Sequence, residues 1–199
     1  NTFLIVAFKP PFLLVHDDGN NQDTLQARVN GYLQLNQNKY PAQAIHRIDY
    51  ETSGLVLFCK HPFFQAYCDK NMEEHHIKKD YIALVQGHTN YKNKKIVSNI
   101  ARDRHNAKKM IIHPNGKESI SIFNTLKNYK DYSLIQVTIL TGRKHQIRVQ
   151  CASLNHPILN DSLYGGKRID NTGLLLQSHH IQFNDIDITC PQEKRFIRK

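Results

Sequence analysis

The sequence predicts an α+β domain with a central mixed, mainly antiparallel sheet flanked by helices and loops. Short apolar runs typical of strands recur along the chain, and helical patterns are interspersed among them without strict alternation. Two of the strand-like runs flank the short turn at residues 128–131, which predicts an antiparallel pair. The chain contains no repeat of fixed period and no Gly/Ser-rich or Pro-rich linker. We therefore expect one domain over residues 1–199, with no separate N-terminal domain.

The first half of the chain alternates strand and helix patterns. Residues 3–8 predict a buried strand that stops at a proline turn. Residues 24–35 have apolar positions close to helical spacing, with Asp23 or Thr24 as the N-cap. The apolar run 54–59 predicts a second strand, and residues 62–76 predict a helix with a proline in its first turn.

The second half is richer in strands. The sequence predicts strands in four places and a helix at residues 144–153, and it predicts an ordered loop at 155–165. The strand regions are 80–86, 119–126, 132–140, and a C-terminal pair at 174–176 and 181–183. Residues 91–117 are basic and rich in turn formers, so we expect a hairpin or an extended loop there.

The composition favours a polyanionic partner. The chain has 27 Lys and Arg against 17 Asp and Glu, a formal net charge of +10. Each contact between a basic side chain and a phosphate releases condensed counterions, which favours nucleic-acid binding. A protein that is basic for other reasons remains the alternative on charge alone.

Cysteine and histidine spacing indicates neither disulfides nor metal. The four cysteines form no Cys-x-x-Cys pair, and no Cys/His cluster among the 12 histidines has the spacing of zinc ligands. No stretch is long and apolar enough to span a membrane, and no signal-peptide pattern is present. We expect free thiols, no metal, no membrane contact and a cytoplasmic location.

Three segments concentrate residues able to carry chemistry. They are residues 46–54 (His-Arg-Ile-Asp-Tyr-Glu-Thr-Ser-Gly), 140–149 (Leu-Thr-Gly-Arg-Lys-His-Gln-Ile-Arg-Val) and 155–165 (Asn-His-Pro-Ile-Leu-Asn-Asp-Ser-Leu-Tyr-Gly). The first directly precedes a strand, and the second joins a strand end to a predicted helix start, which favours anion binding. Each also has a purely structural interpretation: surface ion pairing, a solvated basic helix, and backbone hydrogen bonding within a turn. For His156 and Asp161 we favour this structural role.

Together these segments resemble one family, the RluA-type RNA pseudouridine synthases. Residues 46–49 and 52–55 resemble the family's His-Arg-Leu-Asp and Thr-Ser-Gly-Leu, and residues 79–85 its Lys-x-Tyr-x-Ala-x-Val strand. Residues 141–148 match Thr-Gly-Arg-x-His-Gln-Ile-Arg, and residues 156–165 match His-Pro-Ile followed by Asp and Tyr-Gly. The motifs occur in the family's order between about residues 3 and 183, which is far more specific than any single motif. The chain departs from the pattern at Ile48, Gln150, Asn155, Asn160 and the Gln-Ser pair at 177–178.

The resemblance implies the site residues. Asp49 is expected to be the catalytic carboxylate, acting as nucleophile or base, and Arg143 the cation that keeps it ionised. Tyr81 is expected to stack on the uracil and to assist proton removal through its hydroxyl. Arg47 is expected to enter the space vacated by the flipped nucleotide. The remaining expected substrate contacts are His46, Thr52, Arg148 and Leu176.

The resemblance also implies the partners and leaves alternatives open. The expected substrate is a uridine in ribosomal or transfer RNA, with no cofactor, because the isomerisation is redox-neutral and involves no phosphoryl transfer. We expect a monomer, and no separate RNA-binding domain of the kind some relatives carry. A catalytically silent RNA-binding protein of the same fold is the main alternative. A metal-dependent nuclease is a second alternative, against which the lack of a carboxylate cluster argues.

Overall fold

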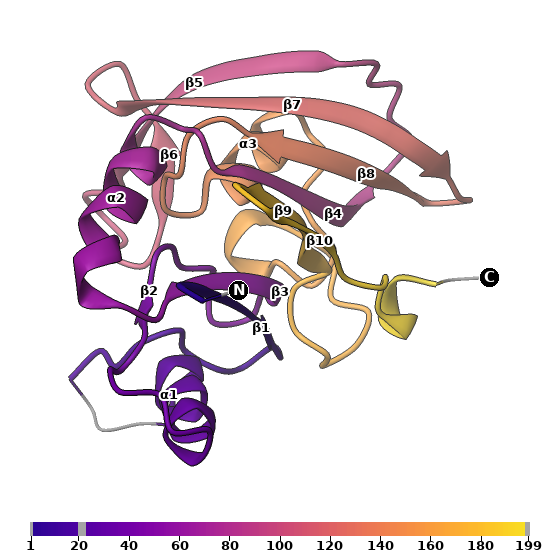
Figure 1. Cartoon of the computed structure of the whole chain (residues 1–199). Coiled ribbons are helices and arrows are strands. Elements are labelled where there is room, and N and C mark those ends of the chain that lie inside the picture. Colours follow the sequence, from indigo (N-terminus) through magenta and orange to yellow (C-terminus); the bar gives the residue numbers. More distant parts are fainter. Residues whose placement is uncertain (1, 20–22, 198–199) are drawn as a thin grey trace.

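The computed structural model describes residues 2–19 and 23–197, which form one sheet with helices around it (Figure 1). The strands are β1 (Leu4–Lys9), β2 (Gln43–Ala44), β3 (Ser53–Cys59), β4 (Lys78–Gln86), β5 (Lys94–Arg102), β6 (Met110–Ile112), β7 (Lys117–Asn128), β8 (Tyr132–Ile139), β9 (Leu176–Phe183) and β10 (Ile186–Thr189). The helices are α1 (Leu25–Leu35), α2 (Pro62–Glu73) and α3 (Gln146–Ser153), with short 3-10 helices at Ser162–Tyr164 and Lys194–Phe196.

The sheet is mixed and mainly antiparallel, as predicted. Its strand order is β1-β3-β9-β4-β8-β7-β5-β6, with β10 paired to β9 and β2 paired to β3. Among the described strands, β3 and β9 are parallel and the other pairs are antiparallel. Gly54 permits the parallel contact, because its φ is +116° and a Cβ there would collide with the backbone of Ser178. The pairing joins the segment after Asp49 to the C-terminal part of the chain.

Local sequence explains where the helices begin and end. The hydroxyl of Thr24 caps α1 by accepting from Ala27 N at 3.1 Å, as predicted. The helix predicted over 62–76 stops at Glu73, because His75 has a left-handed φ of +61°. The helix predicted from residue 144 begins at Gln146, because His145 is left-handed with φ +54°.

The C-terminal strands differ most from the prediction. The segments 174–176 and 181–183 were expected to be separate, but Leu176–Phe183 forms one continuous strand, β9. The prediction divides this strand because polar residues separate its two apolar runs. In the structure, Gln177 and Ser178 from this polar segment are buried, because β9 lies between β3 and β4. The pattern also did not indicate β10, which pairs with β9. Residues 91–117 contain a hairpin, formed by β5 and β6.

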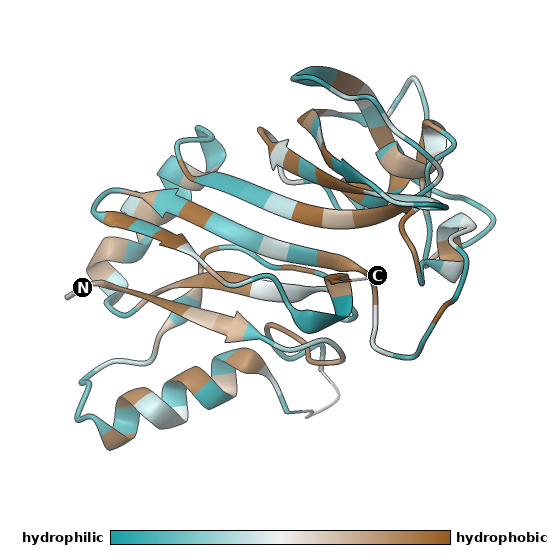
Figure 2. Ribbon diagram, turned by 90° about the vertical axis from the view of Figure 1, so that its right-hand side faces the viewer, coloured by the Kyte–Doolittle hydropathy of each residue, from teal (hydrophilic) through white to brown (hydrophobic). Residues whose placement is uncertain are grey.

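The largest core cluster lies between the sheet and helices α1 and α3, with Val56, Phe58 and Val137 from strands and Val29 and Ile147 from helices. Helix α1 buries Leu25, Val29 and Leu33, which lie on one side of the helix. Figure 2 shows both hydrophobic and hydrophilic residues along this helix, at the bottom of the view. No described helix is long and apolar enough to cross a membrane. All four cysteines are free and buried.

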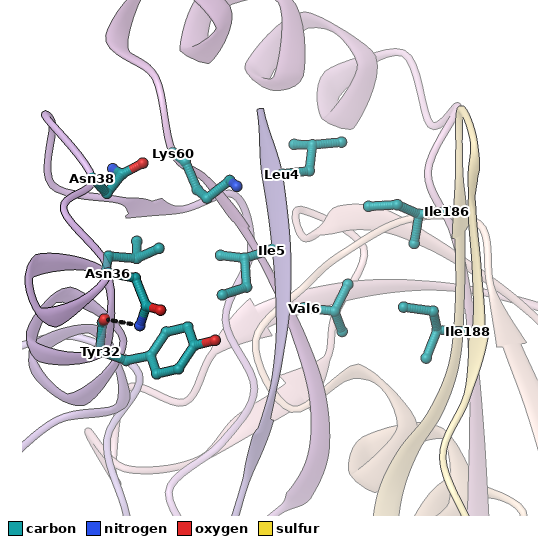
Figure 3. A pocket seen from close by; sticks show the side chains of 10 residues that line it. Leu4, Ile5, Val6, Tyr32, Asn36, Asn38, Lys60, Ile186 and Ile188 are labelled. Carbon is teal, nitrogen blue, oxygen red and sulfur yellow. Dashed lines mark hydrogen bonds between the residues drawn. The ribbon is translucent and has the colours of Figure 1, made fainter. Parts of the chain in front are cut away.

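One cavity of about 390 Å³ lies between α1, β1 and β10 (Figure 3). Ile5 points toward Tyr32 of α1, whereas Leu4 and Val6 point toward the isoleucines of β10. Its lining is mainly aliphatic, and Lys60 is its one ionisable group besides the Tyr32 hydroxyl among the described lining residues. This cavity therefore offers few groups for chemistry. A different cavity contains the residues of the sequence motifs.

Candidate active site

A second cavity, of about 500 Å³, gathers the sequence motifs. It is lined by all eight residues that the sequence predicted for the site: His46, Arg47, Asp49, Thr52, Tyr81, Arg143, Arg148 and Leu176. These residues come from the 46–52 loop, strands β4 and β9, the turn before α3, and the start of α3. Met72, Lys79, Arg102 and His145 also line it. Segments far apart in the sequence are thus brought to one concave site.

A buried lysine holds the loop that carries Asp49. The ammonium of Lys9 is fully buried and donates to the carbonyls of Pro10 at 2.9 Å, Leu13 at 2.8 Å and Tyr50 at 3.0 Å. The Tyr50 carbonyl also accepts from Phe12 N at 2.8 Å. Burial lowers the pKa of Lys9 to about 8, against an opposing effect from the Asp49 charge. These bonds fix the backbone beside Asp49.

Gln146 organises the turn before α3. Its Oε1 accepts from Thr141 Oγ1 at 2.9 Å and from Arg143 N at 3.0 Å, and its Nε2 donates to Ile120 O at 3.1 Å. With His145 in the left-handed region, the chain turns sharply into the helix. Arg148, on the first turn of α3, consequently faces the cavity.

Arg148 links two carboxylates. Its Nη1 donates to Asp49 Oδ2 at 3.1 Å, while its Nε and Nη2 bind the two oxygens of Asp161 at 2.7 and 2.8 Å. Arg148 is 5% exposed and Asp161 is 1% exposed, so their pair is shielded from water. Asp161 thereby fixes the guanidinium in the orientation that holds Asp49.

The structure pairs Asp49 with Arg148, whereas the sequence predicted Arg143 as its partner. The Nε of Arg143 donates to the backbone carbonyl of Glu118 at 2.9 Å, and the ion pair to Asp49 comes from Arg148. The turn at Thr141 and Gly142 places Arg143 before the left-handed His145, so its side chain reaches β7 instead. Arg143 still lines the cavity.

His145 and Tyr164 form a second support beside Asp49, although neither is among the predicted site residues. The Tyr164 hydroxyl accepts from Met110 N at 2.8 Å and lies 2.8 Å from His145 Nδ1. We assign Tyr164 as the donor to His145 Nδ1, so the proton of the neutral imidazole lies on Nε2. This nitrogen is 3.8 Å from Asp49 Oδ2. Burial lowers the pKa of His145 to about 4, against the opposing effect of Asp49, so the ring is neutral at physiological pH.

Tyr81 and Leu176 form apolar surfaces of the cavity. Tyr81 is 6% exposed and Leu176 is 4% exposed, on the neighbouring strands β4 and β9. Burial raises the pKa of the Tyr81 hydroxyl well above its ordinary value, and the Asp49 charge raises it further. The side chain therefore offers a ring face and a neutral hydroxyl rather than a phenolate.

The other predicted residues occupy different depths. His46 is buried, and its Nε2 accepts from Leu57 N at 3.1 Å. Burial, with a smaller effect from the Lys79 charge, lowers the pKa of His46 to about 3, so it is neutral. Thr52 is buried at the end of the loop, where its N–H donates to Asp49 O at 3.1 Å. Arg47 is exposed, 3.4 Å from a ring nitrogen of His16.

The arrangement provides one carboxylate with its orientation fixed, a neutral aromatic face and an apolar wall. Such a set suits attack or proton abstraction at a carbon atom beside a planar ligand. In the described part of the chain, no three His, Cys, Asp or Glu residues are grouped so that they could hold a metal ion. Asp161, Tyr164 and His145 surround Asp49 and Arg148 but are not among the predicted site residues; the first two belong to the third motif, for which the sequence favours a structural role.

Known proteins share this sequence pattern. The family model described as RNA pseudouridylate synthase matches residues 3–153. The chain is 37% identical to ribosomal large subunit pseudouridine synthase C of Buchnera aphidicola over 218 residues, 98% of this chain and 66% of the relative. It is 32% identical to ribosomal large subunit pseudouridine synthase D of Borreliella burgdorferi over 205 residues, 98% of this chain and 61% of the relative. The chain thus spans about two thirds or less of the length of these relatives.

A solved structure shows the same fold. Human RNA pseudouridylate synthase domain containing 4 aligns with a TM-score of 0.77, covering 98% of this chain and 88% of the human one. The sequence identity is 19%, so this likeness concerns the fold alone.

Proposed function

Because the chain belongs to the RNA pseudouridylate synthase family, we propose that it isomerises specific uridines in structured RNA to pseudouridine. The single observation that supports this most strongly is the position of Asp49, held by Arg148 at 3.1 Å in a cavity with Tyr81 and Leu176. A site for this reaction needs a carboxylate beside the ribose and a surface for the base.

The chemistry exchanges one bond to the ribose for another. The bond from C1′ to uracil N1 breaks, the base rotates, and C1′ bonds to uracil C5. Asp49 either attacks C1′ or removes the proton from the adjacent ribose carbon. No electrons are gained or lost overall, so the proposed reaction requires no redox cofactor.

The side chains divide the remaining tasks. Arg148 orients Asp49, and Tyr81 stacks on the uracil with Leu176 on the opposite side. A uridine in folded RNA must leave its stack to reach this cavity. The exposed guanidinium of Arg47 is suited to occupy the space that the nucleotide leaves. Arg143, His46 and Thr52 complete the lining that contacts the nucleotide.

The names of the two bacterial relatives favour ribosomal RNA over transfer RNA as the substrate class. We propose a large-subunit ribosomal RNA uridine as the first substrate to test, and a cytoplasmic monomer as the acting form. The experiment is to map pseudouridines in total RNA from cells with and without the protein.

The first prediction tests the assignment of Asp49. Asp49→Asn should abolish tritium release from RNA labelled at uridine C5, because an amide neither attacks C1′ nor accepts the ribose proton. RNA affinity and the thermal unfolding midpoint should change little, since Asp49 is partly exposed at the cavity.

Asp69→Asn, an exposed change on α2, is the matched control and should retain full activity. Substantial turnover by Asp49→Asn would refute the assignment. RNA binding by wild-type protein without turnover on any RNA would favour the alternative, a catalytically silent binding protein.

A further inference from the structure

Lys79 is a buried cation in the catalytic cavity with no anionic partner. It lies on β4 two residues before Tyr81, so both side chains face the same side of the sheet and line the cavity. Lys79 is 3% exposed, and in the described part of the chain its ammonium has one hydrogen-bond partner, Met72 Sδ at 3.2 Å. A thioether is a weak acceptor, so the ammonium is poorly compensated.

Lys9 is a second buried lysine in this protein, and its contacts are those of a structural residue. Its ammonium is equally buried but donates to three backbone carbonyls, which accounts for all three of its protons. Lys79 has no such set, and burial alone lowers its pKa to about 8 without an opposing charge. A buried charge without a partner is costly, so packing does not account for this lysine.

Two further polar groups without partners line the same cavity. The Nε2 of His46 accepts from Leu57 N, so the ring proton lies on Nδ1, which has no hydrogen-bond partner among the described residues. The hydroxyl of Thr52 also lacks one there. Together with Lys79, the cavity presents hydrogen-bond donors that need an acceptor from a ligand.

The complementary ligand is an electron-rich base edge rather than a phosphate. A phosphate belongs to the RNA backbone and remains hydrated, whereas Lys79 is almost fully enclosed. A base that enters the cavity brings carbonyl oxygens, and uracil has two. We propose that Lys79 is a further catalytic residue, whose ammonium binds a uracil carbonyl and stabilises the uracil anion released from the ribose. This inference rests on the proposed function.

The step balances without a co-reactant. When the bond between C1′ and N1 breaks, its electron pair stays on uracil, where N1 and the two carbonyl oxygens share the charge. Asp49 either forms a bond to C1′, which breaks when C5 attacks C1′, or takes the proton from the adjacent ribose carbon, which is later returned there. C5 then bonds to C1′ and loses its proton, and N1 gains one. Lys79 forms no covalent bond and acts on the developing charge.

The test compares Lys79→Met with Lys78→Met. Lys78 lies on the opposite side of β4, with a half-exposed side chain 3.5 Å from Asp80. Single-turnover tritium release at saturating RNA should fall about 100-fold in Lys79→Met, as for loss of one charge-stabilising donor. It should be unchanged in Lys78→Met. The unfolding temperature of Lys79→Met should equal or exceed that of wild type, because the substitution removes an uncompensated buried charge.

A second substrate separates catalysis from a structural role. Fluorine at C5 withdraws electrons and stabilises the uracil anion, so RNA with 5-fluorouridine at the target should depend less on Lys79. C5 of this base has no proton to lose, so the rearranged base keeps its fluorine, and the measured event is consumption of 5-fluorouridine, followed by nuclease digestion and chromatography. The loss caused by Lys79→Met should be about tenfold smaller on this RNA than on uridine RNA.

Near-wild-type turnover of Lys79→Met, or an equal loss on both RNAs, would overturn the role of Lys79 and leave the proposed function intact. Wild-type protein without activity on either RNA would overturn the proposed function, and this inference with it.

Discussion

Arg143 and Arg148 lie five residues apart in one motif and have the same charge, yet their side chains bind different groups. Arg143 donates to the Glu118 carbonyl, and Arg148 joins Asp49 to Asp161. The difference arises from one left-handed residue, His145, between them. Positive φ is uncommon for residues other than glycine, so the position of this left-handed residue, directly before the helix, could not be predicted from the residue types alone.

Site residues could be predicted from the sequence where their motif lies within or next to a clear strand. Asp49 precedes β3, and Tyr81 and Leu176 lie on strands, so all three reach the cavity. Asp161 was interpreted as a turn residue, because Asp is common in turns. Its role depends on a long-range contact with Arg148 that spacing along the chain does not reveal.

Arg148→Lys should lower single-turnover rates at saturating RNA by roughly 100-fold, because one ammonium cannot hold Asp49 while binding both oxygens of Asp161. RNA affinity, measured by filter binding, should fall far less. Arg143→Ala should keep a single-turnover rate near wild type at saturating RNA and weaken RNA binding instead, because Arg143 lines the cavity but its hydrogen bond goes to the Glu118 carbonyl. A loss in Arg143→Ala as large as in Arg148→Lys would mean that Arg143 approaches Asp49 when RNA binds.

At the scale of elements, the strands and helices with a regular apolar pattern were predicted within a few residues. Helix α1 and strands β3 and β8 are examples. The prediction failed where polar residues are buried, as at Gln177 in β9, because burial there depends on neighbouring strands rather than on local pattern. The 46–52 loop was correctly expected before β3, but its anchor at Lys9 was not.

The second prediction concerns this anchor. Lys9→Met should remove the donor of three buried or partly buried carbonyls, at Pro10, Leu13 and Tyr50. We expect the free energy of unfolding, measured in urea, to fall by about 3 kcal/mol. Turnover should also fall, because the backbone beside Asp49 loses its support. Lys167→Met, at an exposed position, is the control. Unchanged stability and turnover in Lys9→Met would show that the loop holds its conformation without this lysine.

At the scale of the whole molecule, the sheet order could not be predicted from the sequence. Strand β9 is inserted between β3 and β4, which are neighbours in the chain. This insertion places the C-terminal Leu176 against the site formed by the earlier motifs. Local patterns predict that strands exist, whereas their order depends on which buried faces fit together.

Charge is unevenly distributed over this fold. Residues 92–117, which contain β5 and β6, have eight Lys and Arg and one acidic residue. This basic arm lies at the end of the sheet opposite β1, and Figure 1 shows β5 at the top of the view, far from α1. Arg102, at the end of β5, lines the catalytic cavity. The basic arm is therefore positioned to bind RNA whose target uridine enters the cavity.

The last prediction tests that role. Replacing Lys95 and Lys108, both exposed, with Gln should weaken RNA binding and make the slope of log affinity against log salt shallower by roughly 1.5, from two lost phosphate contacts. Lys39, which follows α1, and Lys70, on α2, are both exposed and serve as controls with the same charge change. Their replacement should leave the slope nearly unchanged, because distant surface charges are screened at physiological salt. Filter-binding titrations between low and physiological salt measure both slopes. Equal slopes for the two double variants would mean that the basic arm is a solvated surface and that RNA follows another path to Asp49.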